Sequence, residues 1–259
     1  MNKKLKYIVQ KLVPSVYAYL ARKKRDSILK KFSKNYPDTK VFHPVLKEDI
    51  KLYSQDNQDY IVYENFFKDQ KDGFYCDIGG NHPLKINNTR YFEELGWDGV
   101  AFEPLPHMKK LWAEHRKAKL FPFALSDNEG EVIFTVVKDE TGWEDMLSFV
   151  KETGEVESDF ETDEIQVQTK IFRKVMEDES ITHIDYLSLD VEGHELNVLK
   201  GIDFTKIKIN VLTIENNPPS CILYGDENIR KFMFKNDYFL WGRTIGLDDI
   251  YVRNDFLIQ

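Results

Sequence analysis

From Gly73 onward, short apolar runs and amphipathic segments alternate along the chain. Apolar runs rich in β-branched and aromatic residues predict strands over 74–78, 99–102, 120–125, 131–137, 165–169, 184–189 and 209–214. Apolar positions at helical spacing predict helices over 88–95, 106–117, 170–178, 195–199 and 226–236. Strands that alternate with helices predict an open, mostly parallel sheet with helices on both faces.

The segments on either side of this alternation follow other patterns. Strands over 238–244 and 249–252 predict a hairpin that adds an antiparallel edge to the sheet. Before Gly73, Ser54 is predicted to cap a helix that runs to Phe67. Residues 36–53 contain two prolines and are predicted to be irregular.

Charge divides the chain into a basic head and an acidic body. The net charge is −8, yet residues 1–35 hold eleven Lys or Arg and one acid, Asp26. Residues 138–164 hold eleven Asp or Glu against Lys138 and Lys151, and they show no clear period. We therefore divide the chain into a basic helical extension over 1–50 and a main domain over 51–259, with 138–164 as an acidic insertion or lid.

The basic head suggests contact with an anionic partner, either a membrane surface or a phosphorylated substrate. Apolar residues recur at helical spacing from Ile8 to Leu20, which fits an amphipathic helix lying on a membrane. The alternatives are a solvated helical face, or a helix that packs on the body or on a second subunit of a homodimer. Nucleic acid is not an expected partner because the body is acidic. Two cysteines give no disulfide framework and indicate a reducing cytoplasm.

Polar residues end the four clearest core strands. The first strand ends in Asp77-Ile78-Gly79-Gly80-Asn81, the second in Glu103, and two later ones in Asp190 and in Glu215-Asn216. Ligands of such sheets bind outside the carboxyl ends of the strands, so these residues predict a binding crevice.

The glycine loop and Glu103 together narrow the choice of ligand. Glu103 lies 24 residues after Gly79, a spacing typical of the acid that binds ribose hydroxyls. The phosphate-binding patterns GxGxxG and GxxxxGK[ST] are both absent. A nucleoside without phosphates fits better, and the cationic groups of S-adenosylmethionine suit an acidic crevice. A nicotinamide-dependent oxidoreductase shares the ribose acid but lacks its glycine fingerprint.

Five segments resemble the FkbM-type methyltransferases that use S-adenosylmethionine. They are SQDNQDYIVYENFF, GFYCDIGGNHP, NNTRYFEELGWDGVAFEP, ALSDNEGEVIF and IDYLSLDVEGHELNVLKG, and they cover roughly Ser54 to Asn217. The resemblance implies a Rossmann-like class I methyltransferase fold with a mostly parallel seven-stranded sheet and an antiparallel C-terminal edge hairpin. It also implies methyl transfer, most often to oxygen, on sugars, glycans or secondary metabolites.

The resemblance also assigns residues. Asp77, Gly79 and Asn81 match the cofactor loop, in which Gly80 stands where the family often has Ala. Glu103 matches the ribose-binding acid. The segment that contacts adenine corresponds to Ser126 and Asp127, and the DVEG signature beside the reacting methyl corresponds to Asp190 and Glu192.

A hydroxyl acceptor needs a base or a metal ion to become nucleophilic. His194 is the first candidate base, although a residue in the first turn of a helix can simply face solvent. His82 is the second candidate, and its alternative role is to fix the cofactor loop.

Oxygen ligands at two strand ends predict a metal site. Asp190, Glu215 and Asn216 resemble the Asp…Asp-Asn set of catechol-type O-methyltransferases, and such ligands suit Mg²⁺, Mn²⁺ or Ca²⁺. His194 as a further ligand would favour Mn²⁺. In the alternative, Asp190 and Glu215 only orient cofactor and substrate by hydrogen bonds.

The sequence thus predicts an S-adenosylmethionine-dependent O-methyltransferase. Its expected acceptor is a hydroxyl of a sugar, nucleotide-sugar or glycan precursor, in the cytoplasm and at the inner face of the membrane. Methylation of nitrogen, or of a metabolite that is not a sugar, is the alternative. An NAD-dependent oxidoreductase and a non-catalytic binding module are more remote ones.

Overall fold

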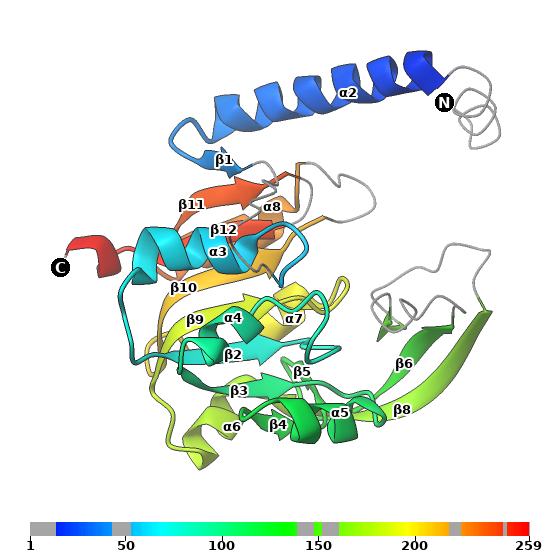
Figure 1. Cartoon of the computed structure of the whole chain (residues 1–259), viewed down its shortest axis with the longest axis vertical. Helices are drawn as coiled ribbons and strands as arrows, with labels where there is room; N and C mark the ends of the chain where they lie inside the picture. The colour runs from blue at the N-terminus through cyan, green and yellow to red at the C-terminus, as the bar shows by residue number, and fades with distance from the viewer. Residues whose placement is uncertain are drawn as a thin grey trace.

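The structure, a computed structural model, describes residues 14–42, 53–138, 148–151, 161–217, 224–245 and 248–258. The start of the basic head, most of the acidic insertion and part of the predicted C-terminal turn lie outside these residues. Within them the chain forms two sheets with helices around the larger one (Figure 1).

The larger sheet has eight strands in the order β1-β11-β12-β10-β9-β2-β3-β4. Their bounds are β1 Lys40–Phe42, β2 Phe74–Ile78, β3 Asp98–Phe102, β4 Lys119–Phe121, β9 His183–Leu189, β10 Lys208–Glu215, β11 Tyr238–Thr244 and β12 Asp248–Arg253. Only β12 runs antiparallel to its neighbours β10 and β11. The prediction of a mixed α/β fold is confirmed.

Two details of the predicted sheet were wrong. Strand β12 lies between β10 and β11, so the C-terminal hairpin is not the edge of the sheet. The edge is β1, which comes from a segment predicted to be irregular and raises the count from seven strands to eight. The β1 strand pairs in parallel with β11, and Phe42 stacks on Trp241 with ring centroids 5.2 Å apart. A three-residue strand held by one aromatic contact leaves no periodic signal in the sequence.

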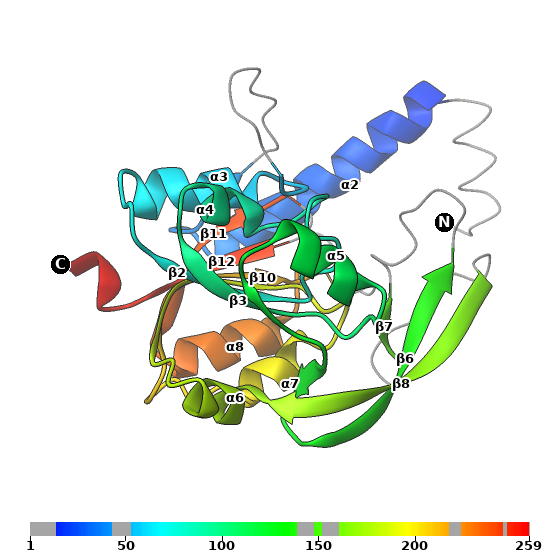
Figure 2. The same cartoon turned by 60° about the horizontal axis from the view of Figure 1, so that its bottom comes forward.

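Helices cover both faces of this sheet, as Figure 2 shows. One face carries α3 (Gln58–Val62), α4 (Arg90–Glu94) and α5 (Met108–His115), and the other carries α6 (Phe172–Asp178), α7 (Glu195–Lys200) and α8 (Glu227–Lys235). Neighbouring residues of the central strands alternate between two buried clusters, for example Tyr75 and Cys76. This is the pattern of strands buried on both faces.

The helix predicted from Ser54 begins later than expected. Helix α3 starts at Gln58 and continues as a π-helix over Tyr63–Phe67. The Ser54 hydroxyl donates to Asp59 Oδ1 at 2.5 Å instead of capping the first turn, and the Tyr53 amide donates to Asp59 Oδ2 at 3.0 Å. The buried carboxylate of Asp59 therefore organises the segment before the helix.

The smaller sheet has the order β5-β8-β6-β7. Its strands are β5 Ala124–Ser126, β6 Gly130–Lys138, β7 Phe149–Val150 and β8 Glu161–Ile171. The single strand predicted over 120–125 is split at Pro122, so that β4 joins one sheet and β5 the other. Strands β6 and β8 pair antiparallel along their length and project from the body as a ribbon (Figure 2).

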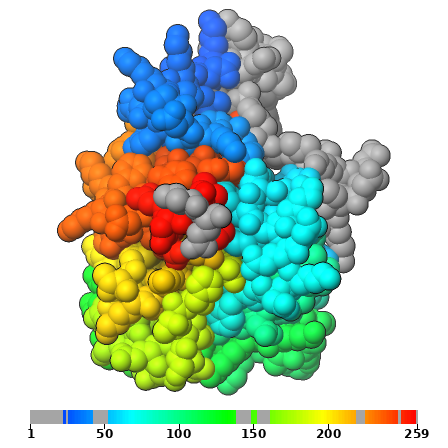
Figure 3. Space-filling view, turned by 90° about the vertical axis from the view of Figure 1, so that its left-hand side faces the viewer, coloured from blue at the N-terminus to red at the C-terminus, as the bar shows by residue number. Residues whose placement is uncertain are grey.

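The N-terminal helix α2 (Pro14–Asn35) stands off the body, as Figures 1 and 3 show. Its last turn is tied down by the fully buried ring of Phe32. No helix in the described ranges is long and apolar enough to cross a membrane.

Candidate active site

A cavity of about 480 Å³ opens at the carboxyl ends of the parallel strands. This volume lies in the range of about 300–1,000 Å³ that is usual for small-molecule sites. The lining residues follow the strand order, from Glu103 after β3, through Gly79 after β2 and Asp190 after β9, to Glu215 on β10 and Asp248 on β12. Because β12 runs antiparallel, its first residue lies at the edge where the other strands end. The cavity therefore spans five neighbouring strands.

The loop after β2 depends on Gly79. Its φ is +83°, a conformation that favours glycine, and a Cβ atom there would lie 1.7 Å from the carbonyl oxygen of Asp190. The Gly79 amide donates to the Phe102 carbonyl at 3.0 Å. These contacts hold the loops after β2, β3 and β9 together at one end of the cavity.

Glu103 lines the cavity and fixes the glycine loop. Its two carboxylate oxygens accept hydrogen bonds from the backbone amides of Asn81 and Leu105, both at 2.8 Å. An ionised carboxylate offers about four acceptor positions. Glu103 therefore keeps the capacity to accept a ligand hydroxyl, as its predicted role requires.

Asp77 does not reach the cavity, although it was predicted as a cofactor ligand. Its buried carboxylate accepts hydrogen bonds from Asn87 Nδ2 at 3.0 Å and Thr89 Oγ1 at 2.7 Å. Burial raises its pKa, and the Thr89 hydrogen bond and the Arg116 charge oppose that shift. Gly80 also lies outside the cavity lining, where a Cβ atom would meet the Trp112 ring at 2.6 Å. Asp77 and Gly80 therefore support the loop after β2 on the side that faces away from the cavity.

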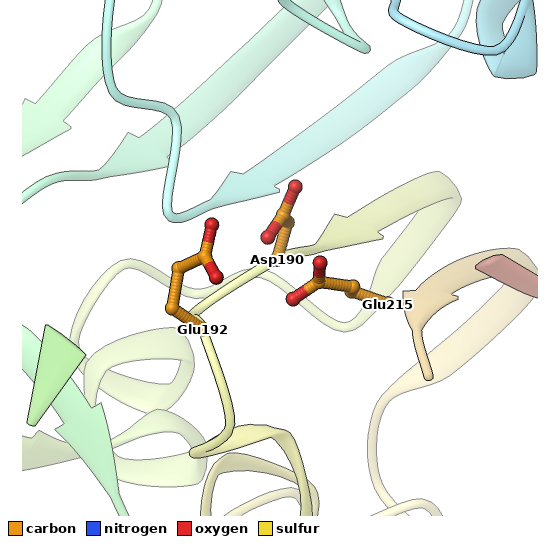
Figure 4. A group of neighbouring side chains, drawn as sticks. All are labelled: Asp190, Glu192 and Glu215. Atoms are coloured by element: carbon orange, nitrogen blue, oxygen red, sulfur yellow. The ribbon is translucent and has the colours of Figure 1, made fainter. Parts of the chain in front are cut away.

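Three carboxylates converge at the middle of the cavity (Figure 4). One oxygen each of Asp190, Glu192 and Glu215 lies within 4.8 Å of the others. Burial, with the neighbouring carboxylate charges, raises the pKa of Asp190 to about 7, that of Glu192 to about 9 and that of Glu215 well above its usual value. No Lys or Arg occurs among the described residues that line the cavity. Such a group of acids favours a bound cation.

The turn that carries Glu192 is held by another carboxylate. Glu192 and Gly193 have φ values of 51° and 98°. Glu195 Oε1 accepts hydrogen bonds from the amides of Val191 at 3.1 Å and Gly193 at 3.0 Å. The DVEG segment thus folds into a tight turn that directs Glu192 toward Asp190 and Glu215 (Figure 4).

His194 lines the cavity, whereas the predicted adenine contacts Ser126 and Asp127 do not. His194 is 6% exposed, so it does not face solvent, and its Nε2 lies 3.1 Å from Ser126 Oγ. Ser126 is buried and Asp127 is exposed, and neither lines the cavity; their neighbours Ala124 and Leu125 do.

His82 lies in the loop after β2, outside the cavity lining. Its Nδ1 accepts from the Leu84 amide at 3.0 Å. This hydrogen bond agrees with the alternative role of fixing the cofactor loop.

Asn216 does not join the carboxylates. Its Oδ1 accepts from the Asp226 amide at 2.5 Å and its Nδ2 donates to Asp249 Oδ2 at 2.8 Å. These bonds hold β10 against β12 and the start of α8, and Asn216 does not line the cavity. The third carboxylate of the group is Glu192, predicted from the DVEG match as a residue beside the reacting methyl.

Gln58 and Asp248, which close the far end of the cavity, were not predicted as site residues. Gln58 Nε2 donates to Asp248 Oδ2, which also accepts from Thr244 Oγ1 at 3.3 Å. Asp248 Oδ1 accepts no hydrogen bond from any described residue. Burial, and then the charge of Asp190, raises the pKa of Asp248 to about 7. Gln58 lies within the family-like segment SQDNQDYIVYENFF, which could have indicated it. Asp248 lies in the predicted turn between the two C-terminal strands, where an acidic residue is common.

The described part of the acidic insertion contributes to the cavity wall. Ser148 and Val150, at β7, line the cavity together with Phe134 of β6. The ribbon of the smaller sheet therefore walls the end that also holds Glu103 and Leu105.

The larger sheet and its edge cavity define an α/β protein that binds a small ligand across the carboxyl ends of its strands. The sequence matches the methyltransferase FkbM domain over residues 77–240, so the chain belongs to the FkbM methyltransferase family. The match begins at the end of β2 and ends within β11, so it includes the strand ends that line the cavity from β2 to β10. No curated protein and no solved structure gives a significant match.

Proposed function

We propose that the protein transfers the methyl group of S-adenosylmethionine to a hydroxyl of a sugar, nucleotide-sugar or glycan precursor. The observation that carries this proposal is the continuous cavity with two chemically different ends. One end has Glu103 between apolar walls, and the other has four carboxyl groups, with no Lys or Arg among the described residues that line the cavity.

The Glu103 end fits the cofactor. Phe102, Leu105 and Leu125 give apolar surface for an adenine ring, and Glu103 has acceptor capacity for ribose hydroxyls. The described residues that line the cavity include no Lys or Arg for the phosphates of a dinucleotide, whereas their carboxylates suit the sulfonium and ammonium charges of this cofactor. When bound, the cofactor supplies an electrophilic methyl group, and the protein has to align the acceptor and accept its proton.

The carboxylate end fits a hard divalent cation such as Mg²⁺ or Mn²⁺. Asp190, Glu192 and Glu215 would hold it, because their oxygens are close enough to share one ion. Such an ion lowers the pKa of a bound hydroxyl. The raised pKa of Asp190, about 7, makes this residue a capable proton acceptor near neutral pH when no ion is bound, with His194 as the alternative base.

The far wall supports a hydroxylated acceptor. Amide side chains of Gln55, Gln58 and Asn88 line the cavity beside Asp248. Amides both donate and accept hydrogen bonds, and the open oxygen of Asp248 accepts them. Several such groups around one cavity can bind several hydroxyls at once, as a sugar ring requires.

An amine acceptor is the second candidate. Its support is the same cluster of uncompensated carboxylates, which would attract an ammonium group as readily as a metal ion. The two candidates differ in metal dependence, because methylation of an amine by this cluster needs no divalent ion.

The decisive experiment incubates the full chain with labelled S-adenosylmethionine and a panel of sugars, nucleotide-sugars, lipid-linked sugars and amines, with and without Mn²⁺ or Mg²⁺ after chelation. We expect a labelled sugar that forms only with metal. A labelled amine formed without metal would replace O-methylation by the second candidate, and full activity on a sugar after exhaustive chelation would exclude the metal.

Two variants separate the two ends of the cavity. Glu103→Gln is expected to weaken binding of S-adenosylhomocysteine, measured by thermal shift. Glu192→Gln should keep that binding and lose Mn²⁺ binding together with turnover. Asp127→Asn is the control, because Asp127 is exposed and does not line the cavity. A thermal shift with NAD in place of S-adenosylhomocysteine would refute the choice of cofactor.

A further inference from the structure

Helix α2 carries a concentration of positive charge that the cavity does not use. Its 22 residues include seven Lys or Arg and one acid, Asp26. Lys23, Lys24, Lys30 and Lys34 are all exposed. Residues 23, 30 and 34 are spaced by seven and four positions, so they lie on one side of the helix. The first eight residues of the helix, from Pro14 to Ala21, contain no charge and include two tyrosines.

The other end of α2 is fixed firmly to the body. The Phe32 ring is fully buried and lies 5.0 Å from the Arg230 guanidinium, which also lies 4.8 Å from the Tyr36 ring. Arg230 in turn pairs with Asp249 of β12 at 2.9 Å. Tyr36 adds a hydrogen bond to Glu227 of α8 at 2.5 Å. The helix is therefore anchored to the sheet at one end and is not a loosely attached tail.

The free end of the helix points in a specific direction. Figure 1 shows that α2 extends from its anchor toward the side on which the parallel strands end, which is also the side of the cavity. The basic helix and the acidic cavity thus share one side of the molecule. A surface that attracts the helix would face the cavity opening.

We propose that α2 docks the protein on an anionic lipid bilayer, with the uncharged first turns entering the interface and the lysines facing the lipid headgroups. Uncharged turns with tyrosines, followed by a lysine cluster, have the composition of helices that lie at membrane interfaces. Each lysine near such a surface adds to the electrostatic attraction. Because Phe32 and Arg230 hold the helix against the sheet, a helix docked on the bilayer would also fix the orientation of the sheet relative to the bilayer.

The test measures binding of the full chain to vesicles of phosphatidylcholine alone and of phosphatidylcholine with about one third phosphatidylglycerol. The docking variant carries four substitutions, Lys23→Gln, Lys24→Gln, Lys30→Gln and Lys34→Gln. The matched control loses the same charge from exposed lysines that precede or begin strands at the opposite edge of the sheet, by Lys71→Gln, Lys117→Gln, Lys206→Gln and Lys208→Gln. Thermal unfolding of each variant without ligand checks that both keep their fold.

We expect the wild type and the control to sediment with the anionic vesicles and not with the neutral ones. The docking variant should bind at least about tenfold more weakly, and about 0.5 M NaCl should release the wild type. Equal binding to both kinds of vesicle, an equal loss in both variants, or a docking variant that binds like the wild type would overturn the proposal. So would a salt-sensitive dimer that forms through the helix in place of vesicle binding. Because no methyl transfer is measured, these outcomes are independent of the proposed function.

Discussion

Asp248 and Asp249 are adjacent carboxylates on β12 that should respond in opposite ways to the same substitution. Asp248 is 2% exposed and its partners are neutral, Gln58 and Thr244. Asp249 is fully buried and pairs with Arg243 at 2.5 Å and Arg230 at 2.9 Å. Replacement by Asn keeps the shape of each side chain and removes its charge, so the two variants isolate the energetic effect of the charge.

The pKa shifts set the sign and size of the effect. Burial raises the pKa of Asp248 from 3.8 to about 7, so the folded state holds its proton more tightly than the unfolded state. Wild-type stability should therefore fall as pH rises from about 4 to 7, and Asp248→Asn should avoid this loss. The shift corresponds to a gain on the order of 2–4 kcal/mol for the variant at pH 8. The two arginines hold the pKa of Asp249 low despite its burial, so Asp249→Asn should cost about 3–5 kcal/mol at pH 8.

Urea unfolding at pH 5 and pH 8, with a chelator present, measures both effects. The stability advantage of Asp248→Asn should be larger at pH 8 than at pH 5, whereas Asp249→Asn should be destabilised at both. The same Asp248→Asn protein should bind S-adenosylhomocysteine normally and lose methyl transfer, because Asp248 lies at the far end of the cavity. A variant that is less stable than the wild type at pH 8, or an advantage that does not change with pH, would refute this account of the buried carboxyl.

Three further changes probe the loop, the cofactor end and the helix anchor. Gly79→Ala should lower the free energy of unfolding by about 2–4 kcal/mol, because its Cβ atom would collide with the Asp190 carbonyl; urea unfolding measures this loss, and wild-type stability would contradict it. Glu103→Gln should weaken S-adenosylhomocysteine binding about tenfold in calorimetry, and unchanged affinity would remove Glu103 from the ribose site. Phe32→Ala should lower the free energy of unfolding by about 3–5 kcal/mol and speed trypsin cleavage at the exposed lysines of α2, because the helix loses its anchor; unchanged stability and cleavage would contradict it.

The sequence was sufficient to predict that the polar ends of the central strands lie together. Each of β2, β3, β9 and β10 is a short apolar run that ends in a polar residue or is followed directly by polar or glycine residues, and parallel strands bring such ends to one edge. The structure accordingly places Gly79, Glu103, Asp190 and Glu215 around one cavity. Local pattern and the topology of alternating strands and helices were enough for this part of the site.

The positions of Asp77 and Asp248 could not be predicted, because they depend on contacts between segments that are distant in the sequence. Asp77 was expected at the ligand because it ends a strand, but Asn87, Thr89 and Arg116 bind or surround its carboxylate on the far side. Asp248 reaches the cavity only because β12 inserts antiparallel beside β10. Neither the partners of a buried carboxylate nor the insertion of one strand between two others leaves a periodic signal.

The distribution of charge explains why the buried carboxyls persist despite their energetic cost. Asp190, Glu192, Glu215 and Asp248 each have a raised pKa, so each disfavours the folded state as pH rises. A carboxylate that only stabilised the fold would be expected to form an ion pair, as Asp249, the residue after Asp248, does with Arg230. None of these four acids forms an ion pair with a described Lys or Arg. A cation brought by the cofactor, a metal or the acceptor would supply the missing positive charge. The apo protein then gives up stability that ligand binding restores, and this cost is expected where a protein must attract positive charge from solution.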